Sequence, residues 1–248
     1  MCTVIYIPQK NGALFSSCRD EHPGRLTIPP KIKFHNDTRI VCPQDKEKGG
    51  TWIGATENGT AVILLNGGFE RHVKTGNYAK SRGLIALALM GQTSVVDAWI
   101  GQSLMNIEPF TLIVWQTNKL YQLTWEGQKK YKKQLDVSKP AIWSSATLYD
   151  NSAVALRNTW FNKVFCNLDE INEETLLHFL LQHNDPQNGF VMHRSDALKT
   201  VSISMMRLQI KKVCLTYYDL GNQTNTTEDL QLTDTPYATE MENIPDKN

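Results

Sequence analysis

The sequence predicts an α+β protein built as a four-layer αββα sandwich, and three observations support this fold class. The segments 3–7 and 61–65 are apolar or β-branched along their whole length, so both faces of their strands are expected to be covered. A tight-turn signal, Asn11-Gly12, joins the first two strands into a hairpin. Strands and helices occur in groups, as in two sheets packed face to face with helices outside.

Composition indicates an ordinary globular chain. Of its 248 residues, 41% are hydrophobic and 21% are charged, which fits one domain with a sizeable core. A formal net charge of +1 gives no overall field that would attract nucleic acid or an anionic membrane. No apolar run approaches the ~20 residues that span a bilayer, and no secretory signal precedes the first strand. We therefore expect a cytoplasmic protein with no transmembrane segment and no nucleic-acid partner.

The first hairpin predicts which side chains lie near the start of the chain. With Asn11 and Gly12 as a two-residue turn between strands 3–7 and 13–17, Cys2 would lie opposite Glu21. The turn therefore brings the segment 18–21 to the N-terminus.

Within that segment, neighbouring residues point to opposite faces of the sheet. Arg19 would lie opposite Val4, on the same face as Cys2 and diagonal to it. Asp20 would lie opposite Thr3, on the other face. Both charged side chains are thus expected close to the chain start.

The remaining elements follow from local patterns. Proline and glycine in 22–50 predict loops and one edge strand, and 49–54 opens the next strand. Helix propensity and near-helical apolar spacing predict helices, and apolar runs predict two further hairpins. We expect helices at 84–90, 94–105, 153–165 and 173–182, and hairpins at 110–116 with 120–125 and 200–208 with 212–218.

Two regions are predicted to lie at the surface. Lys129, Lys130, Lys132 and Lys133 surround Tyr131 and favour a solvated strand edge over a phosphate-binding patch. From 221 onward the chain is polar, so we expect a domain at 1–220 and a poorly ordered tail at 221–248.

The cysteines argue against disulfides and metal. Five cysteines (Cys2, Cys18, Cys42, Cys166 and Cys214) are scattered and lack C-x-x-C spacing. His178 and His183 are five apart and do not share a helical face as metal ligands would. We assign no metal and no cofactor.

Cys2 stands out because it follows the initiator methionine. Removal of Met1 would give one residue both a thiol, of ordinary pKa near ~8.5, and a free α-amine near ~7.7–8.0. A nucleophile that carries its own base needs no separate histidine. A redox pair of Cys2 with Cys18 is disfavoured, because the two would lie on opposite faces.

Several short motifs occur together in a fixed order: Met1-Cys2-Thr3, Ser17-Cys18-Arg19-Asp20-Glu21, Gly49-Gly50-Thr51-Trp52-Ile53-Gly54, Leu65-Asn66, Ser81-Arg82-Gly83 and Asn106-Ile107-Glu108-Pro109-Phe110. This combination resembles the NRDE family, also called the transport and Golgi organization protein 2 family. The family is similar to the N-terminal nucleophile (Ntn) hydrolases, near the bile-salt hydrolases and penicillin acylases. That likeness also implies an αββα sandwich.

The resemblance implies a role for individual residues. Cys2 would be the nucleophile, Asp20 would hold its α-amine, and Asn66 would donate to the oxyanion. Arg19 matches the family's own arginine. The asparagine of the motif is Cys18 here, and the hydrolases' second oxyanion asparagine has no clear match. Ser144 and Ser145 occupy its neighbourhood, and we assign substrate contacts to Ser145 and Trp52.

Two functions from different classes follow. The first is an N-terminal-cysteine amidohydrolase or acyltransferase that acts on the carbon–nitrogen bond of a small-molecule acyl amide. The alternative is a non-catalytic binding or trafficking module for a lipid, an acyl-thioester or a haem-like ligand on the same fold.

Overall fold

The computed structural model describes residues 3–76, 78–165 and 171–233. Over these ranges the chain forms four helices and two seven-stranded antiparallel sheets. No helix among the described residues is both long and apolar enough to cross a membrane. Cys2 and Cys166 lie outside the described residues.

The first sheet contains β1 (Thr3–Gln9), β2 (Gly12–Glu21), β10 (Ala141–Ser144), β11 (His193–Ser195), β12 (Leu198–Leu208), β13 (Lys212–Asp219) and β14 (Thr224–Gln231). The second sheet contains β3 (Thr27–His35), β4 (Thr38–Asp45), β5 (Ile53–Thr56), β6 (Ala61–Asn66), β7 (Phe110–Gln116), β8 (Lys119–Trp125) and β9 (Lys130–Leu135). The helices are α1 (Arg82–Met90), α2 (Val95–Gly101), α3 (Asn151–Phe165) and α4 (Glu173–Gln182).

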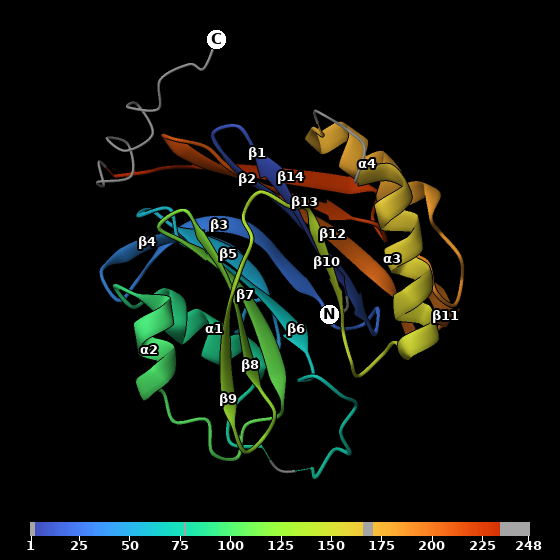
Figure 1. Ribbon diagram of the computed structural model, residues 1–248, viewed down its shortest axis with the longest axis horizontal. Helices are drawn as coiled ribbons and strands as arrows, with labels where there is room; N and C mark the ends of the chain where they lie inside the picture. Colours follow the sequence, from blue (N-terminus) through green and yellow to red (C-terminus); the bar gives the residue numbers. More distant parts are fainter. Residues whose placement is uncertain (1–2, 77, 166–170, 234–248) are drawn as a thin grey trace.

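The elements form four layers (Figure 1). The strand order is β10-β1-β2-β12-β13-β14 in the first sheet, with β11 beside β12, and β3 to β9 in sequence in the second. Helices α3 and α4 lie on the outer side of the first sheet, and α1 and α2 lie on the outer side of the second. The αββα sandwich predicted from the sequence is therefore confirmed.

Strand β1 shows why no polar alternation is visible in its sequence. Val4 and Tyr6 point into the core between the sheets, whereas Ile5 and Ile7 pack with residues of α3 and α4. All four side chains are buried. Both faces of a strand in the middle of a sandwich must be apolar, and this is what the run 3–7 indicated.

The predicted register of the first hairpin was wrong by two residues. Gln9 pairs with Gly12, so Lys10 and Asn11 form the turn, and Thr3 lies opposite Cys18 rather than Asp20. Gly12 is the first residue of β2, and β12 passes so close to it that a Cβ there would lie 2.0 Å from the Leu208 carbonyl oxygen. A shift of two preserves the face of every side chain, so Arg19 and Asp20 still point to opposite sides.

Two other segments differ from expectation because edge strands tolerate polar sequence. The region 22–50 holds a complete hairpin, β3–β4, whose two-residue turn is Asn36-Asp37 with both φ values positive. The predicted tail begins with β14, which pairs with β13 along its whole length. Its polar side chains are tolerated because one face of this edge strand meets water.

The other predicted elements are confirmed with small changes in length. Helix α4 covers the expected 173–182, and α3 begins two residues before the expected start. Helix α2 ends at Gly101 instead of continuing to 105. The lysine cluster is strand β9 at the sheet edge, where Lys130 Nζ donates to the carbonyls of Trp99, Ile100 and Gln102 and so caps α2.

Candidate functional site

Three of the residues predicted to form the site line one cavity between the two sheets. Arg19 comes from β2, Trp52 from the segment before β5, and Asn66 from the end of β6. The cavity has a volume of about 250 Å³. Thr3 pairs with Cys18, the residue before Arg19, so strand β1 begins beside this cavity.

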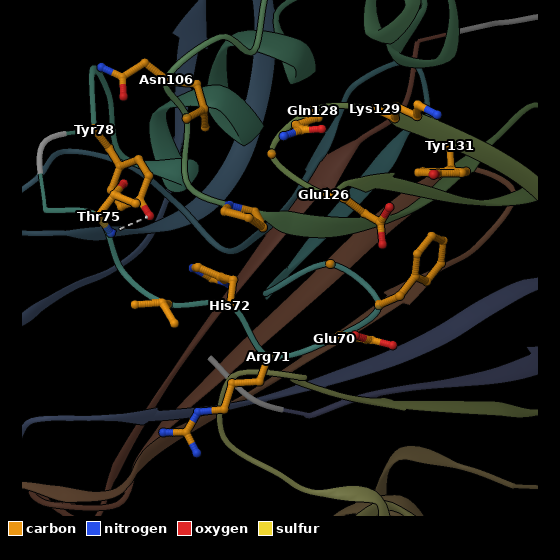
Figure 2. A pocket seen from close by; sticks show the side chains of 16 residues that line it. Glu70, Arg71, His72, Thr75, Tyr78, Asn106, Glu126, Gln128, Lys129 and Tyr131 are labelled. Atoms are coloured by element: carbon orange, nitrogen blue, oxygen red, sulfur yellow. Dashed lines mark hydrogen bonds between the residues drawn. The ribbon is translucent and has the colours of Figure 1, made fainter.

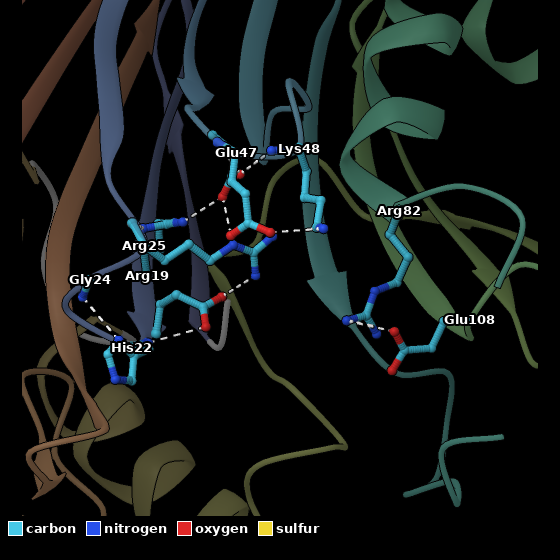
Figure 3. Close-up of polar contacts among 10 residues, drawn as sticks. Arg19, His22, Gly24, Arg25, Glu47, Lys48, Arg82 and Glu108 are labelled. Carbon is cyan, nitrogen blue, oxygen red and sulfur yellow. Dashed lines mark hydrogen bonds and ion pairs between the residues drawn. The ribbon is translucent and has the colours of Figure 1, made fainter. Parts of the chain in front are cut away.

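Arg19 is almost fully buried and is held by an acidic partner that the sequence did not reveal. Its Nη2 donates to Asp45 Oδ2 at 2.9 Å, and its Nη1 donates to the Arg25 carbonyl at 2.9 Å. Arg25 Nε approaches the same Asp45 oxygen at 2.8 Å, and Arg25 Nη1 donates to Glu21 at 2.7 Å (Figure 3). Burial lowers the pKa of Arg19, whereas Glu21 and Asp45 oppose this shift. The charge of Arg19 is therefore largely balanced within the cluster.

Trp52 forms one wall of the cavity. The Arg19 guanidinium lies over its indole, 4.6 Å from the ring centroid. The side chain is 2% exposed, and its Nε1 is buried without a hydrogen-bond acceptor among the described residues. A buried indole N–H without an acceptor is uncommon in folded proteins.

Asn66 is fixed by contacts from both sides. Its backbone carbonyl accepts from Ser145 Oγ at 2.7 Å, and Ser145 also contacts Thr147 Oγ1 at 2.9 Å. The next residue, Gly67, has φ of +90°, and a Cβ there would crowd Thr147 at 3.0 Å. Ser145 was expected to contact substrate, but among the residues described its hydroxyl binds Asn66 and Thr147.

Asp20 points to the helix side of the first sheet, as its position beside Arg19 predicts. Its Oδ2 accepts from the Tyr149 hydroxyl at 2.9 Å, and its Oδ1 accepts from Thr200 Oγ1. A bulge in β12 between Thr200 and Ser202 accompanies this arrangement. The carboxylate is 4% exposed and is oriented by two hydroxyl groups.

Sequence reasoning missed Arg157, which holds the start of β1 in place. This residue of α3 is fully buried and donates to Thr3 Oγ1, Ser144 Oγ and the carbonyls of Asn188 and Gly189. Its guanidinium also lies over the Tyr149 ring at 3.5 Å. Arg157 thus links α3, β10 and β1 next to position 2.

A larger cavity of about 650 Å³ adjoins the first (Figure 2). His72 lines it, and His72 Nε2 lies 3.2 Å from Glu108 Oε1, whose other oxygen pairs with Arg82 at 3.2 Å. Arg82 and Glu108 line the smaller cavity (Figure 3). The side chains of His72, Glu108 and Arg82 therefore separate the two cavities.

Two glycines of the predicted motifs let backbone segments meet beside the site. A Cβ at Gly50 would lie 2.5 Å from the carbonyl carbon of Gly83, at the start of α1.

Because the clashing atom is backbone, we expect Gly50→Ala to lower the free energy of unfolding by about 1–3 kcal/mol in urea denaturation. Gly101→Ala is the control, since a Cβ there meets no described atom within 4 Å. An equal loss in both variants would contradict this explanation.

The structure thus brings Arg19, Trp52 and Asn66 into one cavity and places Ser145 behind Asn66. Asp20 lies on the opposite face of β2, and Cys2 lies outside the described residues. Three arginines (Arg19, Arg25 and Arg82) line the cavity together with their acidic partners Glu21, Asp45 and Glu108, and Asn66 contributes an amide side chain. The arginines and the Asn66 amide are hydrogen-bond donors, which suit a substrate or intermediate that carries negative charge on oxygen.

Solved structures similar to this chain share its architecture. A mutant of the conjugated bile acid hydrolase from Clostridium perfringens, with alanine in place of a cysteine, matches with a TM-score of 0.58 and 13% identity over 93% of this chain and 92% of that one. A variant of the same hydrolase with leucine in place of an arginine matches with a TM-score of 0.57 and 13% identity, covering 92% of each chain. The Caenorhabditis elegans ortholog of N-acylethanolamine-hydrolyzing acid amidase gives 0.53 and 13%, over 83% of this chain and 92% of that one.

These likenesses and the four layers define the class: the chain has the fold of the Ntn hydrolases. A search of curated proteins gave no match. The family model described as "Transport and Golgi organisation 2" matches residues 1–241, and the chain belongs to that family.

Proposed function

We propose that this protein is an Ntn-type hydrolase that cleaves the amide bond of a small acyl amide with Cys2 as nucleophile. One observation carries the proposal: Arg19 and Asn66, far apart in sequence, line one cavity beside the beginning of β1. The fold shared with two amide-bond hydrolases supports it. The proposal also requires that Met1 be removed, which frees the α-amine.

Acylation would proceed in two proton transfers. The α-amine of Cys2 accepts the thiol proton, and the sulfur attacks the amide carbonyl carbon. The oxyanion that forms accepts a hydrogen bond from the Asn66 side-chain amide. As the carbon–nitrogen bond breaks, the α-ammonium donates its proton to the leaving amine. Water, activated by the regenerated α-amine, then releases the acyl group as a carboxylic acid.

The charged residues would serve mainly to position these groups. Asp20 is proposed to accept from the α-ammonium, and its orientation is fixed by Tyr149 and Thr200. Arg19 is paired with Asp45, which balances part of its charge. We therefore assign Arg19 to shaping the cavity and binding substrate. Its positive charge would also stabilise the Cys2 thiolate.

The proposal predicts that Cys2→Ala abolishes hydrolysis of a panel of acyl amides, because no other group replaces the thiol. The assay is release of free amine, combined with intact-mass measurement to show that Met1 is absent. Cys214→Ala is the matched control, since this buried thiol belongs to β13. Amine release that survives Cys2→Ala, or a protein that retains Met1, would rule out the mechanism. Ligand retained without turnover would instead support the binding-module alternative.

A further inference from the structure

The larger cavity opens at one end of the molecule where three loops meet. It is lined by the segment after β6, by Asn106 after α2, and by the turn between β8 and β9. Figure 2 shows Glu70, Arg71 and His72 on one side and Glu126 and Tyr131 on the other. The proposed hydrolysis does not use the outer rim of this cavity.

Large apolar side chains are exposed around that rim. Phe69 is 52% exposed and packs edge-to-face against Tyr131, with ring centroids 5.1 Å apart. Val73 lines the cavity at 87% exposure, and Met105 precedes Asn106 at 83%. Apolar side chains gathered in this way mark an interaction surface.

Basic residues gather on the same segments. The three segments 68–80, 105–109 and 126–133 contain seven lysines and arginines against three glutamates, a formal charge of +4, although the whole chain carries only +1. The Lys130 ammonium is hydrogen-bonded to carbonyls at the end of α2, but Lys129, Lys132 and Lys133 are exposed. The near-neutral net charge of the chain is therefore the sum of a positive charge on these segments and a negative charge on the rest of the sequence.

We propose that this end of the molecule docks onto an anionic lipid surface. The docking surface comprises Phe69, Val73, Met105, Tyr131, Lys129 and Lys133. Exposed apolar side chains inserted at the headgroup level, with lysines around them, are the combination that binds such interfaces. The cavity opening then faces the lipid, so that an amphiphile can enter from the membrane.

The test is co-sedimentation with vesicles of phosphatidylcholine alone and vesicles that also contain phosphatidylglycerol. We expect binding to the anionic vesicles that weakens as salt is raised. The double variant Lys129→Glu/Lys133→Glu is expected to reduce binding by on the order of tenfold or more. Phe69→Ser/Val73→Ser is expected to reduce binding comparably while removing no charge. These positions are exposed, so circular dichroism is expected to be unchanged.

Matched controls come from other parts of the chain. Lys10→Glu/Lys211→Glu makes the same charge change in the turns after β1 and β12, away from the cavity. Phe34→Ser removes a phenylalanine of β3 that is 73% exposed. Both controls, and Cys2→Ala, are expected to bind vesicles as the wild type does, so this test is independent of turnover.

Three results would overturn the proposal. The first is a wild-type protein that does not sediment with anionic vesicles. The second is equal loss of binding in the docking-surface variants and their controls. The third is light scattering that shows a dimer dissociated by Phe69→Ser/Val73→Ser without vesicle binding, which would assign the docking surface to a second copy of the chain.

Discussion

Replacement of Arg157 by methionine is expected to lower the free energy of unfolding by about 2–5 kcal/mol, the largest effect on stability of any single change discussed. The side chain is fully buried, and its partners among the described residues are neutral oxygens. Methionine fills part of the volume but leaves the carbonyls of Asn188 and Gly189 without donors. Denaturant unfolding monitored by tryptophan fluorescence measures the change.

The controls for Arg157 separate geometry from charge. Arg157→Lys keeps the charge but loses the planar fork, so a loss smaller than that of the methionine variant is expected. Arg39→Met removes a half-exposed arginine paired with Glu57 and is expected to cost no more than about 1 kcal/mol. If Arg157→Met were no more costly than Arg39→Met, the buried contacts would not stabilise the fold as described.

Replacement of Asn66 by alanine is expected to reduce kcat for amide hydrolysis by about 10²–10³-fold, with little change in KM. The reason is that the amide N–H is proposed to bind the oxyanion, which is fully charged only near the transition state. The measurement is steady-state kinetics on the acyl amide that the wild type hydrolyses best.

A second asparagine, far from the cavity, provides the control for the Asn66→Ala variant. Asn225→Ala, on the exposed edge strand β14, is expected to leave kcat unchanged. Ser145→Ala keeps the Asn66 side chain but removes the bond to its carbonyl, so an intermediate loss is expected. An Asn66→Ala enzyme with wild-type kcat would show that the oxyanion is stabilised elsewhere.

The layers could be predicted from the sequence because their signals are local. Helix α4 has an Asn172 cap that accepts from Thr175 N–H, and apolar residues at helical spacing follow it. Strand β1 is apolar on both faces because it lies between two layers. The hairpin β3–β4 was missed because Pro29, Pro30 and exposed lysines are typical of loops, and an edge strand tolerates them.

The site could be predicted only in part, because its supporting residues carry no local signal. Arg19 and Asn66 stand in recognisable motifs, and the structure places both at one cavity. Asp45, which binds Arg19, is followed by Lys46, Glu47 and Lys48, a charged run that is typical of a solvated turn. Arg157 stands in α3 between Leu156 and Asn158, and neither neighbour indicates that its charge is buried. Long-range packing decides which of these charges is buried.

The bond from Ser145 Oγ to the Asn66 carbonyl connects the two sheets of the sandwich. Asn66 ends β6 of the second sheet, whereas Ser145 directly follows β10 of the first. A newly synthesised chain whose two sheets have not yet packed together would hold the proposed nucleophile without its oxyanion donor. The protein would therefore become reactive toward amides only once folding is complete.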